Sequence, residues 1–236
     1  MDMLSENLSD SVIGLPKRNL DDNTIHLETF SWLPVFRGGG VAAAVSPAEQ
    51  WEAYPEQGYW TYDDWSQLPD DGFRYEVIDG VLYMSPPPST AHQRAVSKLV
   101  ARMEIHAEKE ALGVVFPAPI AVQLPDQAAI VQPDILFVAK DRQHIIGSTV
   151  IEGAPDLIVE ILSPSNWTYD RGEKMEAYRQ AGVREYWIAD GRAKTVEVFI
   201  LEDESYYLTG KFSSGETAES VVMKGFTILV DIVFSQ

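Results

Sequence analysis

A nearly continuous apolar run at residues 155–163 constrains the fold of this chain more than any other segment. The run reads PDLIVEILS, and apolar residues follow one another in it instead of alternating with polar ones. Such a pattern is typical of a central strand that other elements cover on both faces of the sheet. The sequence therefore predicts a layered fold with helices on both sides of a sheet.

The remaining segments predict the elements around this strand. They comprise a hairpin at 74–85 joined through Asp79-Gly80, a helix from 89 or 90 to about 112, β-rich runs at 114–124 and 130–139, a helix from 170 to about 181, a strand at 184–189, a hairpin at 194–201 and 205–208, and a terminal segment at 226–234. Residues 170–173 (DRGE) resemble a capping box that opens the second helix. This order predicts a mixed α/β or α+β fold, with a helix on each face of a central sheet and extra hairpins at both ends.

Composition and charge narrow the classes of protein that this chain can represent. The 236 residues include 18 basic and 36 acidic side chains, a net charge of −18. This balance excludes a broad basic coat for nucleic acid, but not a local basic groove. The most basic stretch per residue is 131–200, where we expect any contact with a phosphate chain. The absence of cysteine excludes disulfides, thiolate zinc sites and thiol catalysis.

The chain divides into an N-terminal arm at 1–54, which lacks sustained periodicity, and one domain at 55–236. No segment approaches the ~18 consecutive apolar residues that a membrane helix needs. The first residues also lack the basic-then-apolar pattern of a signal peptide. We therefore expect a cytoplasmic protein with no membrane partner.

One acidic side chain interrupts the apolar run. Glu160 lies between Val159 and Ile161, and on a strand it shares one face with Ile158 and Leu162. A carboxylate in such surroundings is unfavourable unless it is paired, hydrogen-bonded, protonated or bound to a metal. Glu160 is therefore either a structural glutamate that an arginine or backbone donors satisfy, or a functional group.

A second acid is expected next to the first. Pro133 and Asp134 lead directly into the apolar residues 135–138, and a proline belongs at the start, edge or bulge of a strand. Asp134 would then emerge beside the strand of Glu160, although the Pro-Asp pair is also common in turns. Two carboxylates on neighbouring strands form a hard oxygen site that suits Mg²⁺ or Mn²⁺. Such a cation lowers the pKa of a bound water and neutralises charge on a phosphodiester.

Three further side chains are candidates for the same chemistry. Lys174 lies on the helix after the strand of Glu160, one turn before Tyr178, and could orient a water or stabilise charge on phosphorus; alternatively it is a solvated helix lysine. His92 and Gln93 lie near the start of a helix, where anionic groups such as phosphate are favoured. The alternative for His92 is a partly exposed residue of the first turn.

Asp134, Glu160 and Lys174, within this order of elements, resemble the PD-(D/E)XK nuclease superfamily. More closely, the chain resembles the Uma family of restriction-endonuclease-like proteins over about residues 58–202. The matching segments are RYEVIDGVLYMSPPPSTAHQ (74–93), VQPDILFVA (131–139), APDLIVEILSPSN (154–166), YDRGEKMEAYRQAGVREYWIAD (169–190) and TVEVF (195–199).

The resemblance implies a restriction-endonuclease-like core in which Asp134 and Glu160 are the metal ligands. Glu76 matches an early acid of the family that could complete the metal site, or it is a surface charge of the hairpin. The superfamily usually has a lysine two positions after the second acid, where this chain has Leu162. The resemblance implies that Lys174, on the following helix, takes over the function of that lysine.

Together these observations predict an endonuclease that depends on Mg²⁺ or Mn²⁺ and hydrolyses phosphodiester bonds in nucleic acid, with DNA as the favoured substrate. The expected catalytic residues are Asp134, Glu160, Lys174 and Glu76, and His92 and Gln93 are expected to bind substrate. The resemblance also implies a homodimer. The alternative is an inactive protein of the nuclease fold that acts as a binding module, which the net charge and Leu162 both favour.

Overall fold

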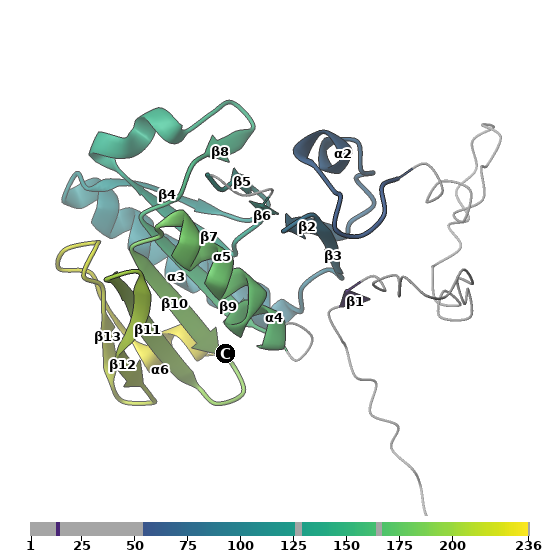
Figure 1. Ribbon diagram of the computed structural model, residues 1–236. Coiled ribbons are helices and arrows are strands. Elements are labelled where there is room, and N and C mark those ends of the chain that lie inside the picture. The colour runs from purple at the N-terminus through teal and green to yellow at the C-terminus, as the bar shows by residue number, and fades with distance from the viewer. Residues whose placement is uncertain (1–12, 15–53, 126–128, 164–166, 236) are drawn as a thin grey trace, which may run out of the picture.

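A computed structural model describes residues 13–14, 54–125, 129–163 and 167–235 (Figure 1). Almost all of the arm predicted at 1–54 lies outside these residues, so the division at residue 54 stays a prediction. Among the described residues, no helix combines the length and the apolar character needed to cross a membrane.

The main sheet has six strands in the order β12-β11-β10-β9-β7-β4 (Figure 1). These strands are β4 (Gly113–Pro117), β7 (Ile135–Ala139), β9 (Leu157–Leu162), β10 (Glu185–Asp190), β11 (Thr195–Glu202) and β12 (Ser205–Phe212). Strand β9 is central and mixed in its pairing, because it runs parallel to β10 and antiparallel to β7. All six of its residues are buried, so the prediction drawn from the apolar run is confirmed.

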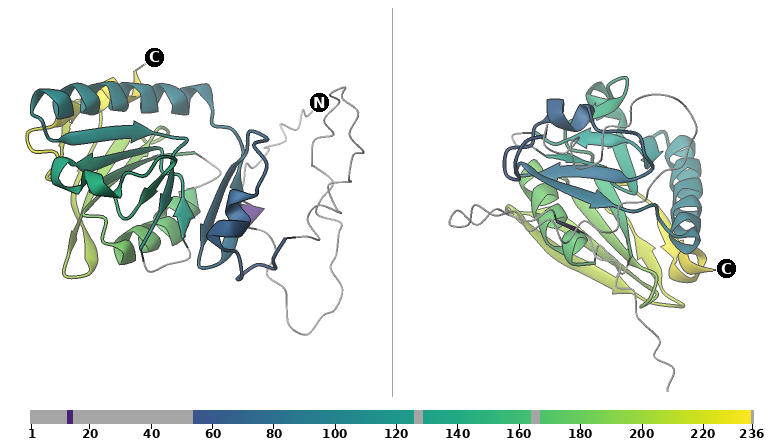
Figure 2. Two further views of the ribbon diagram at one scale, coloured as in Figure 1. Left: turned by 90° about the horizontal axis from the view of Figure 1, so that it is seen from above. Right: turned by 90° about the vertical axis from the view of Figure 1, so that its right-hand side faces the viewer.

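Helices cover both faces of this sheet, as predicted (Figure 2). The helices are α2 (Tyr62–Ser66), α3 (Thr90–Lys109), α4 (Trp167–Arg171), α5 (Glu173–Ala181), α6 (Val230–Phe234) and a 3₁₀ helix, η2 (Lys140–Ile145). Leu99 and Met103 of α3 pack with Leu157 and Val159 on one face. The side chain of Tyr178, from α5, packs on the opposite face.

A second sheet carries the N-terminal hairpin, in the order β1-β3-β2-β6-β5-β8. Its strands are β1 (Ile13–Gly14), β2 (Arg74–Ile78), β3 (Val81–Ser85), β5 (Ala121–Gln123), β6 (Ile130–Val131) and β8 (Val150–Glu152). The turn between β2 and β3 holds Asp79 and Gly80 at φ 51° and 71°, as this dipeptide predicts. A Cβ at Gly80 would lie 2.4 Å from the carbonyl oxygen of Gly58, so only glycine fits. A small third sheet pairs β13 (Thr217–Glu219) with β14 (Thr227–Leu229).

Two predicted β-rich runs are each divided between the sheets. The run at 114–124 becomes β4 in the main sheet and β5 in the second, and the run at 130–139 becomes β6 in the second and β7 in the main sheet. Pro119 interrupts the first run and Pro133 the second. Because proline cannot donate to a strand ladder, each run breaks there and its two halves pair with different neighbours.

The predicted capping box at residues 170–173 is wrong. Helix α4 already ends at Arg171, and Gly172 precedes α5 without providing a side-chain cap. Asp170 lies inside α4 and is fully buried. Its carboxylate therefore faces the interior of the protein and not the start of a helix.

Candidate active site

Strand pairing brings Asp134 and Glu160 together. Ile135, the first residue of β7, lies opposite Val159 of β9, so Asp134 lies beside Glu160. The backbone N–H of Asp134 points to Glu160 Oε2 at 3.4 Å, and the N–H of Ile161 donates to Asp134 Oδ2 at 2.9 Å. Both carboxylates are buried, each with an exposed fraction of 1%. The two acids therefore share one closed site at the edge where β7 begins.

Lys174 points from the first turn of α5 into the same site. Its Nζ lies 2.8 Å from Glu160 Oε1 and 3.0 Å from Glu76 Oε1. Tyr178, one turn further along α5, donates from its hydroxyl to Glu160 Oε1 at 2.7 Å. Lys174 is 1% exposed, so it is not a solvated helix lysine. The face that Lys174 and Tyr178 share is the face that meets Glu160.

Glu76 reaches the site from the second sheet. It lies in the middle of β2, it is buried, and its Oε1 accepts a hydrogen bond of 2.6 Å from the backbone N–H of Gln132. The alternative that Glu76 is a surface charge of the hairpin is therefore wrong. The site lies where the hairpin β2–β3 meets the main sheet, and it needs both sheets to be complete.

The first turn of α3 contributes a histidine. His92 is buried, and its Nε2 lies 2.9 Å from Asp134 Oδ2. On the other side of the carboxylate, Arg74 Nη1 donates to Asp134 Oδ1 at 2.8 Å. Gln93 is exposed, and the structure does not bring it to these residues. Of the two predicted substrate-binding residues, His92 therefore lies inside the site and Gln93 lies on the surface.

Arg74, Asp170 and Tyr178 belong to the site but were not predicted as part of it. Asp170 Oδ1 lies 3.8 Å from Lys174 Nζ. In the described part of the chain, neither oxygen of this buried carboxylate has a hydrogen-bond partner. One signal was present in the sequence: Lys174 and Tyr178 are four residues apart and share one face of α5, and Asp170 lies four residues before Lys174, in α4. Arg74 carries no comparable local signal, because it comes from the other sheet.

We refer to Glu76, Asp134, Glu160 and Asp170, together with Arg74 and Lys174, as the buried charge cluster. Four carboxylates face two permanent cations, which leaves a formal balance of −2 when His92 is neutral. Buried charge without compensation is strongly unfavourable. The cluster is therefore short of positive charge, by the amount that one divalent cation carries.

The ionisation of the acids reflects this shortage. Burial raises the pKa of Glu160 to about 7, and the neighbouring charges of Asp134 and Glu76 contribute in the same direction. Burial likewise raises the pKa of Asp170 well above its usual range. Asp134 behaves differently, because the hydrogen bond from His92 and the charge of Arg74 outweigh its burial and hold its pKa well below the ordinary value. Without a further cation, the cluster takes up protons on Glu160 and Asp170.

Lys174 stays charged in this environment. Burial alone would lower its pKa, but the carboxylates of Glu160, Glu76 and Asp170 outweigh burial and raise it. A permanent ammonium group can stabilise negative charge or orient a water molecule, but it cannot accept a proton as a general base. This limits the chemistry of Lys174 to electrostatic stabilisation and positioning.

The donor set fits a hard divalent cation in chemistry and in charge. Carboxylate oxygens are the ligands that Mg²⁺ and Mn²⁺ prefer, and the unpartnered oxygens of Asp170 mark acceptor capacity that the protein itself does not use. Within the described ranges, no three aspartate, glutamate or histidine side chains already converge on one point where a metal would fit. Lys174 Nζ lies between Glu76 and Glu160, so side chains would have to rearrange to admit an ion.

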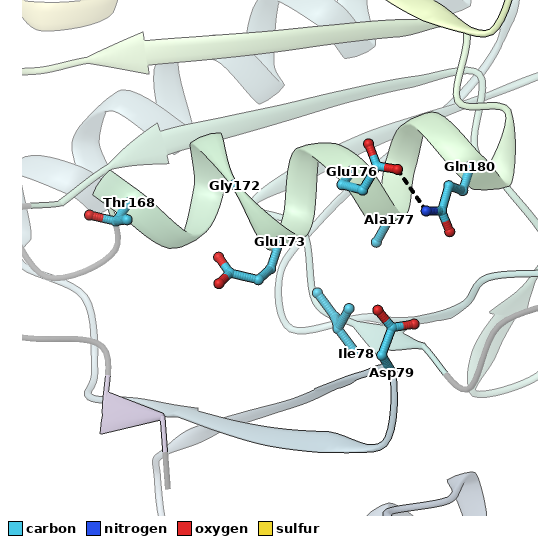
Figure 3. A pocket seen from close by; sticks show the side chains of 8 residues that line it. All are labelled: Ile78, Asp79, Thr168, Gly172, Glu173, Glu176, Ala177 and Gln180. Carbon is cyan, nitrogen blue, oxygen red and sulfur yellow. Dashed lines mark hydrogen bonds between the residues drawn. The ribbon is translucent and has the colours of Figure 1, made fainter. Parts of the chain in front are cut away.

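A surface pocket lies close to these elements but excludes the buried charge cluster. It measures about 500 Å³ and lies between the end of β2 and the segment from Thr168 to Gln180 (Figure 3). Three acids, Asp79, Glu173 and Glu176, line it, and no basic side chain does. An acidic wall of this kind repels phosphate, so we do not assign the pocket to the binding of nucleic acid.

Replacing Glu160 by glutamine is expected to stabilise the protein in metal-free buffer at pH 8. The folded-state pKa of about 7 lies above the ordinary value of 4.5, so the folded protein retains a proton that the unfolded chain releases. Stability therefore falls as the pH rises from about 4.5 to above 7, and glutamine removes this loss. We expect the midpoint of thermal unfolding of Glu160→Gln to exceed that of the wild type by several degrees at pH 8, and by little at pH 4.5. A lower midpoint at pH 8 would instead identify Glu160 as a structural group.

The mixed sheet with helices on both faces matches the fold of a solved protein that is titled a putative nuclease. The chain matches the family model of Uma2, described as "Putative restriction endonuclease", over residues 61–231. It therefore belongs to the Uma2 family, which confirms the predicted family.

A solved structure and a curated protein are also similar to this chain. The crystal structure of a protein from Anabaena variabilis, titled a putative nuclease belonging to DUF820, has a TM-score of 0.62 and 20% identity, and the match covers 75% of this chain and 98% of that chain. This likeness confirms the fold class. An uncharacterized protein of Synechocystis sp. is 22% identical over 162 residues, which is 68% of this chain and 83% of that protein.

Proposed function

We propose that this protein is an endonuclease that depends on Mg²⁺ or Mn²⁺ and hydrolyses phosphodiester bonds in DNA. The observation that carries the proposal is the buried charge cluster, in which acids from three separate elements surround a lysine and lack compensating positive charge. Such a cluster is unfavourable for folding, so a functional cation is its simplest explanation.

Two other buried acids in the same domain support this reading by contrast. Asp156 is fully buried, but Arg142 and Arg184 both donate to its Oδ1, at 2.8 and 2.5 Å, and the N–H of Ala139 donates to Oδ2. Glu185 is satisfied by donors from other elements, among them the N–H of Val222 at 2.6 Å. The fold thus compensates buried acids where they are structural. In the buried charge cluster, Asp170 is the exception, because neither of its carboxylate oxygens accepts a hydrogen bond within the described residues, and a functional role accounts for it.

In the proposed mechanism, Asp134 and Glu160 hold the metal, and Glu76 and Asp170 supply further negative charge around it. When bound, a divalent cation lowers the pKa of a water ligand and neutralises charge on the phosphodiester. Arg74, His92 and the N–H of Ile161 fix the orientation of Asp134.

The other end of the site orients Glu160 and supplies positive charge. Tyr178 donates to Glu160 Oε1 and so holds this carboxylate in place. Lys174, as a permanent cation, orients the attacking water and stabilises the negative charge that develops on phosphorus.

The alternative function is a binding module that keeps the nuclease fold without activity. Leu162, in the position of the usual lysine, packs in the apolar core and cannot take part in catalysis. The two functions differ in whether Lys174 serves in place of that lysine. They also differ in whether the buried charge cluster takes up a metal.

The proposal is tested by nicking of supercoiled plasmid DNA. We expect the purified protein to nick the plasmid with Mg²⁺ or Mn²⁺, and the activity to disappear in EDTA and return when excess metal is added. A preparation of Glu160→Gln, purified in parallel, controls for a contaminating nuclease. If nicking is absent with both metals, or if the variant nicks as fast as the wild type, the proposed activity is wrong.

A further inference from the structure

Helix α3 carries a row of three cations along its outer side. Arg94, Lys98 and Arg102 are four residues apart, so they share one helix face. Arg94 and Arg102 are exposed, and Lys98 is half-buried. At ~1.5 Å of rise per residue, the row is about 12 Å long. We refer to these three residues as the α3 cation row.

The α3 cation row is not neutralised by acidic side chains. Lys98 Nζ donates to the carbonyl and hydroxyl oxygens of Ser235, and Arg102 Nη1 donates to the carbonyl of Lys98. Within the residues that the structure describes, no carboxylate forms an ion pair with any of the three. Partial desolvation and the charges of Arg94 and Arg102 lower the pKa of Lys98, as expected where cations repel one another.

Among its described residues, the stretch 131–200, which has the most basic composition, contains no comparable row of unpaired cations. Five of the eight cations in 131–200 are bound to carboxylates; they are Arg142, Arg171, Lys174, Arg179 and Arg184. The expectation that residues 131–200 contact a phosphate chain came from the number of basic residues alone, and it did not account for these ion pairs. In a protein with a net charge of −18, three cations in line without acidic partners are the more favourable place for a polyanion.

The α3 cation row begins near the candidate active site, on the outer side of the helix whose inner side carries His92. His92, in the first turn of α3, contacts Asp134, and the row begins two residues later at Arg94. Figure 2 shows α3 extending from the β2–β3 hairpin along the main sheet. One strand of DNA carries a phosphate every ~3.4 Å of helix axis, so a 12 Å row spans about three to four phosphates. A backbone bound along α3 would therefore pass the end of the helix that contacts the buried charge cluster.

We propose that the α3 cation row binds the sugar-phosphate backbone of DNA and guides it to the buried charge cluster. This inference rests on the proposed function and adds to it the surface that binds the substrate. An anionic membrane is the less favourable ligand for the row. A helix that binds membranes inserts an apolar face, whereas Ala95, Leu99 and Met103 of α3 are already buried against the sheet.

The test is the affinity of two double variants for a fluorescein-labelled DNA duplex of random sequence. Binding is measured by fluorescence anisotropy in EDTA over a series of salt concentrations. We expect Arg94→Gln with Arg102→Gln to raise Kd at least about tenfold at moderate salt. The slope of log affinity against log salt should fall by about two, since each phosphate contact contributes about 0.9. The control, Lys140→Gln with Arg192→Gln, removes the same charge from exposed positions outside α3 and should change Kd less than about twofold.

Several results would overturn this inference. One is equal weakening by both double variants, which would show a general effect of net charge. A second is binding of the duplex by Arg94→Gln with Arg102→Gln that is as tight as in the wild type. A third is a wild-type protein that binds phosphatidylserine vesicles through the row but does not bind DNA. Nicking assays distinguish the two proposals: binding that depends on the row without any nicking refutes the proposed activity alone. Nicking with binding that does not depend on the row refutes this inference alone.

Discussion

Replacing Asp134 by asparagine is expected to lower the rate of plasmid nicking about a thousandfold or more. Asp134 favours the ionised state, because Arg74 and His92 outweigh its burial and hold its pKa low. Asparagine keeps the size of the side chain but removes the charge that would bind the metal. Charge stabilisation by a metal contributes several kcal/mol to a transition state, and each ~1.4 kcal/mol is a factor of ten in rate.

The matched control for this prediction is Asp141→Asn. Asp141 is an exposed acid in η2, and its substitution should leave the rate of nicking unchanged. Circular dichroism of each variant establishes that the fold is intact. If Asp134→Asn is folded and nicks at the rate of the wild type, Asp134 is not part of the catalytic machinery.

Replacing Lys174 by methionine is expected to destabilise the protein by about 3–5 kcal/mol in metal-free buffer. The substitution preserves the length of the side chain but leaves Glu76, Glu160 and Asp170 buried without the cation between them. Removal of one partner of a buried ion pair costs this much because the other charge stays buried. The measurement is urea unfolding at pH 8, which lies above the pKa of about 7 of Glu160 and so favours its ionised form.

The double variant Lys174→Met with Glu160→Gln separates this cause from a simple packing defect. If the loss comes from uncompensated charge, removing the Glu160 charge as well should recover a large part of the stability. A packing defect would leave the double variant as unstable as Lys174→Met. A loss below about 1 kcal/mol in the single variant would mean that Lys174 does not compensate the acids.

Local sequence pattern predicted the central part of the site because burial can be read from neighbouring residues. Glu160 stands out since every neighbour in β9 is apolar, and Pro133 fixes Asp134 at the start of the next strand. The position of Lys174 on the helix after β9 was predicted as well, from its place in the order of elements. Asp134 and Glu160 are close in space because β7 pairs with β9, and Lys174 reaches Glu160 from the first turn of α5.

The rest of the site depends on contacts between segments that are distant in the sequence. Arg74 reaches Asp134 only because the hairpin β2–β3 forms a second sheet against the first. Local sequence pattern did not predict the second sheet. The runs at 114–124 and 130–139 are each divided between the two sheets, and the strands with which each half pairs come from distant parts of the chain. Asp170 resembled a helix cap, and only the kink at Gly172 shows that it lies inside the preceding helix.

The most direct test of the central claim is a titration of metal-free protein with Mn²⁺, followed by electron paramagnetic resonance at several pH values. We expect saturable binding that tightens from pH 6 to pH 8, because the metal displaces protons from Glu160 and Asp170. Asp134→Asn should abolish this binding, whereas Asp141→Asn should retain it. Binding that is absent from the wild type, or that survives unchanged in Asp134→Asn, would contradict the claim that the buried charge cluster is a metal site.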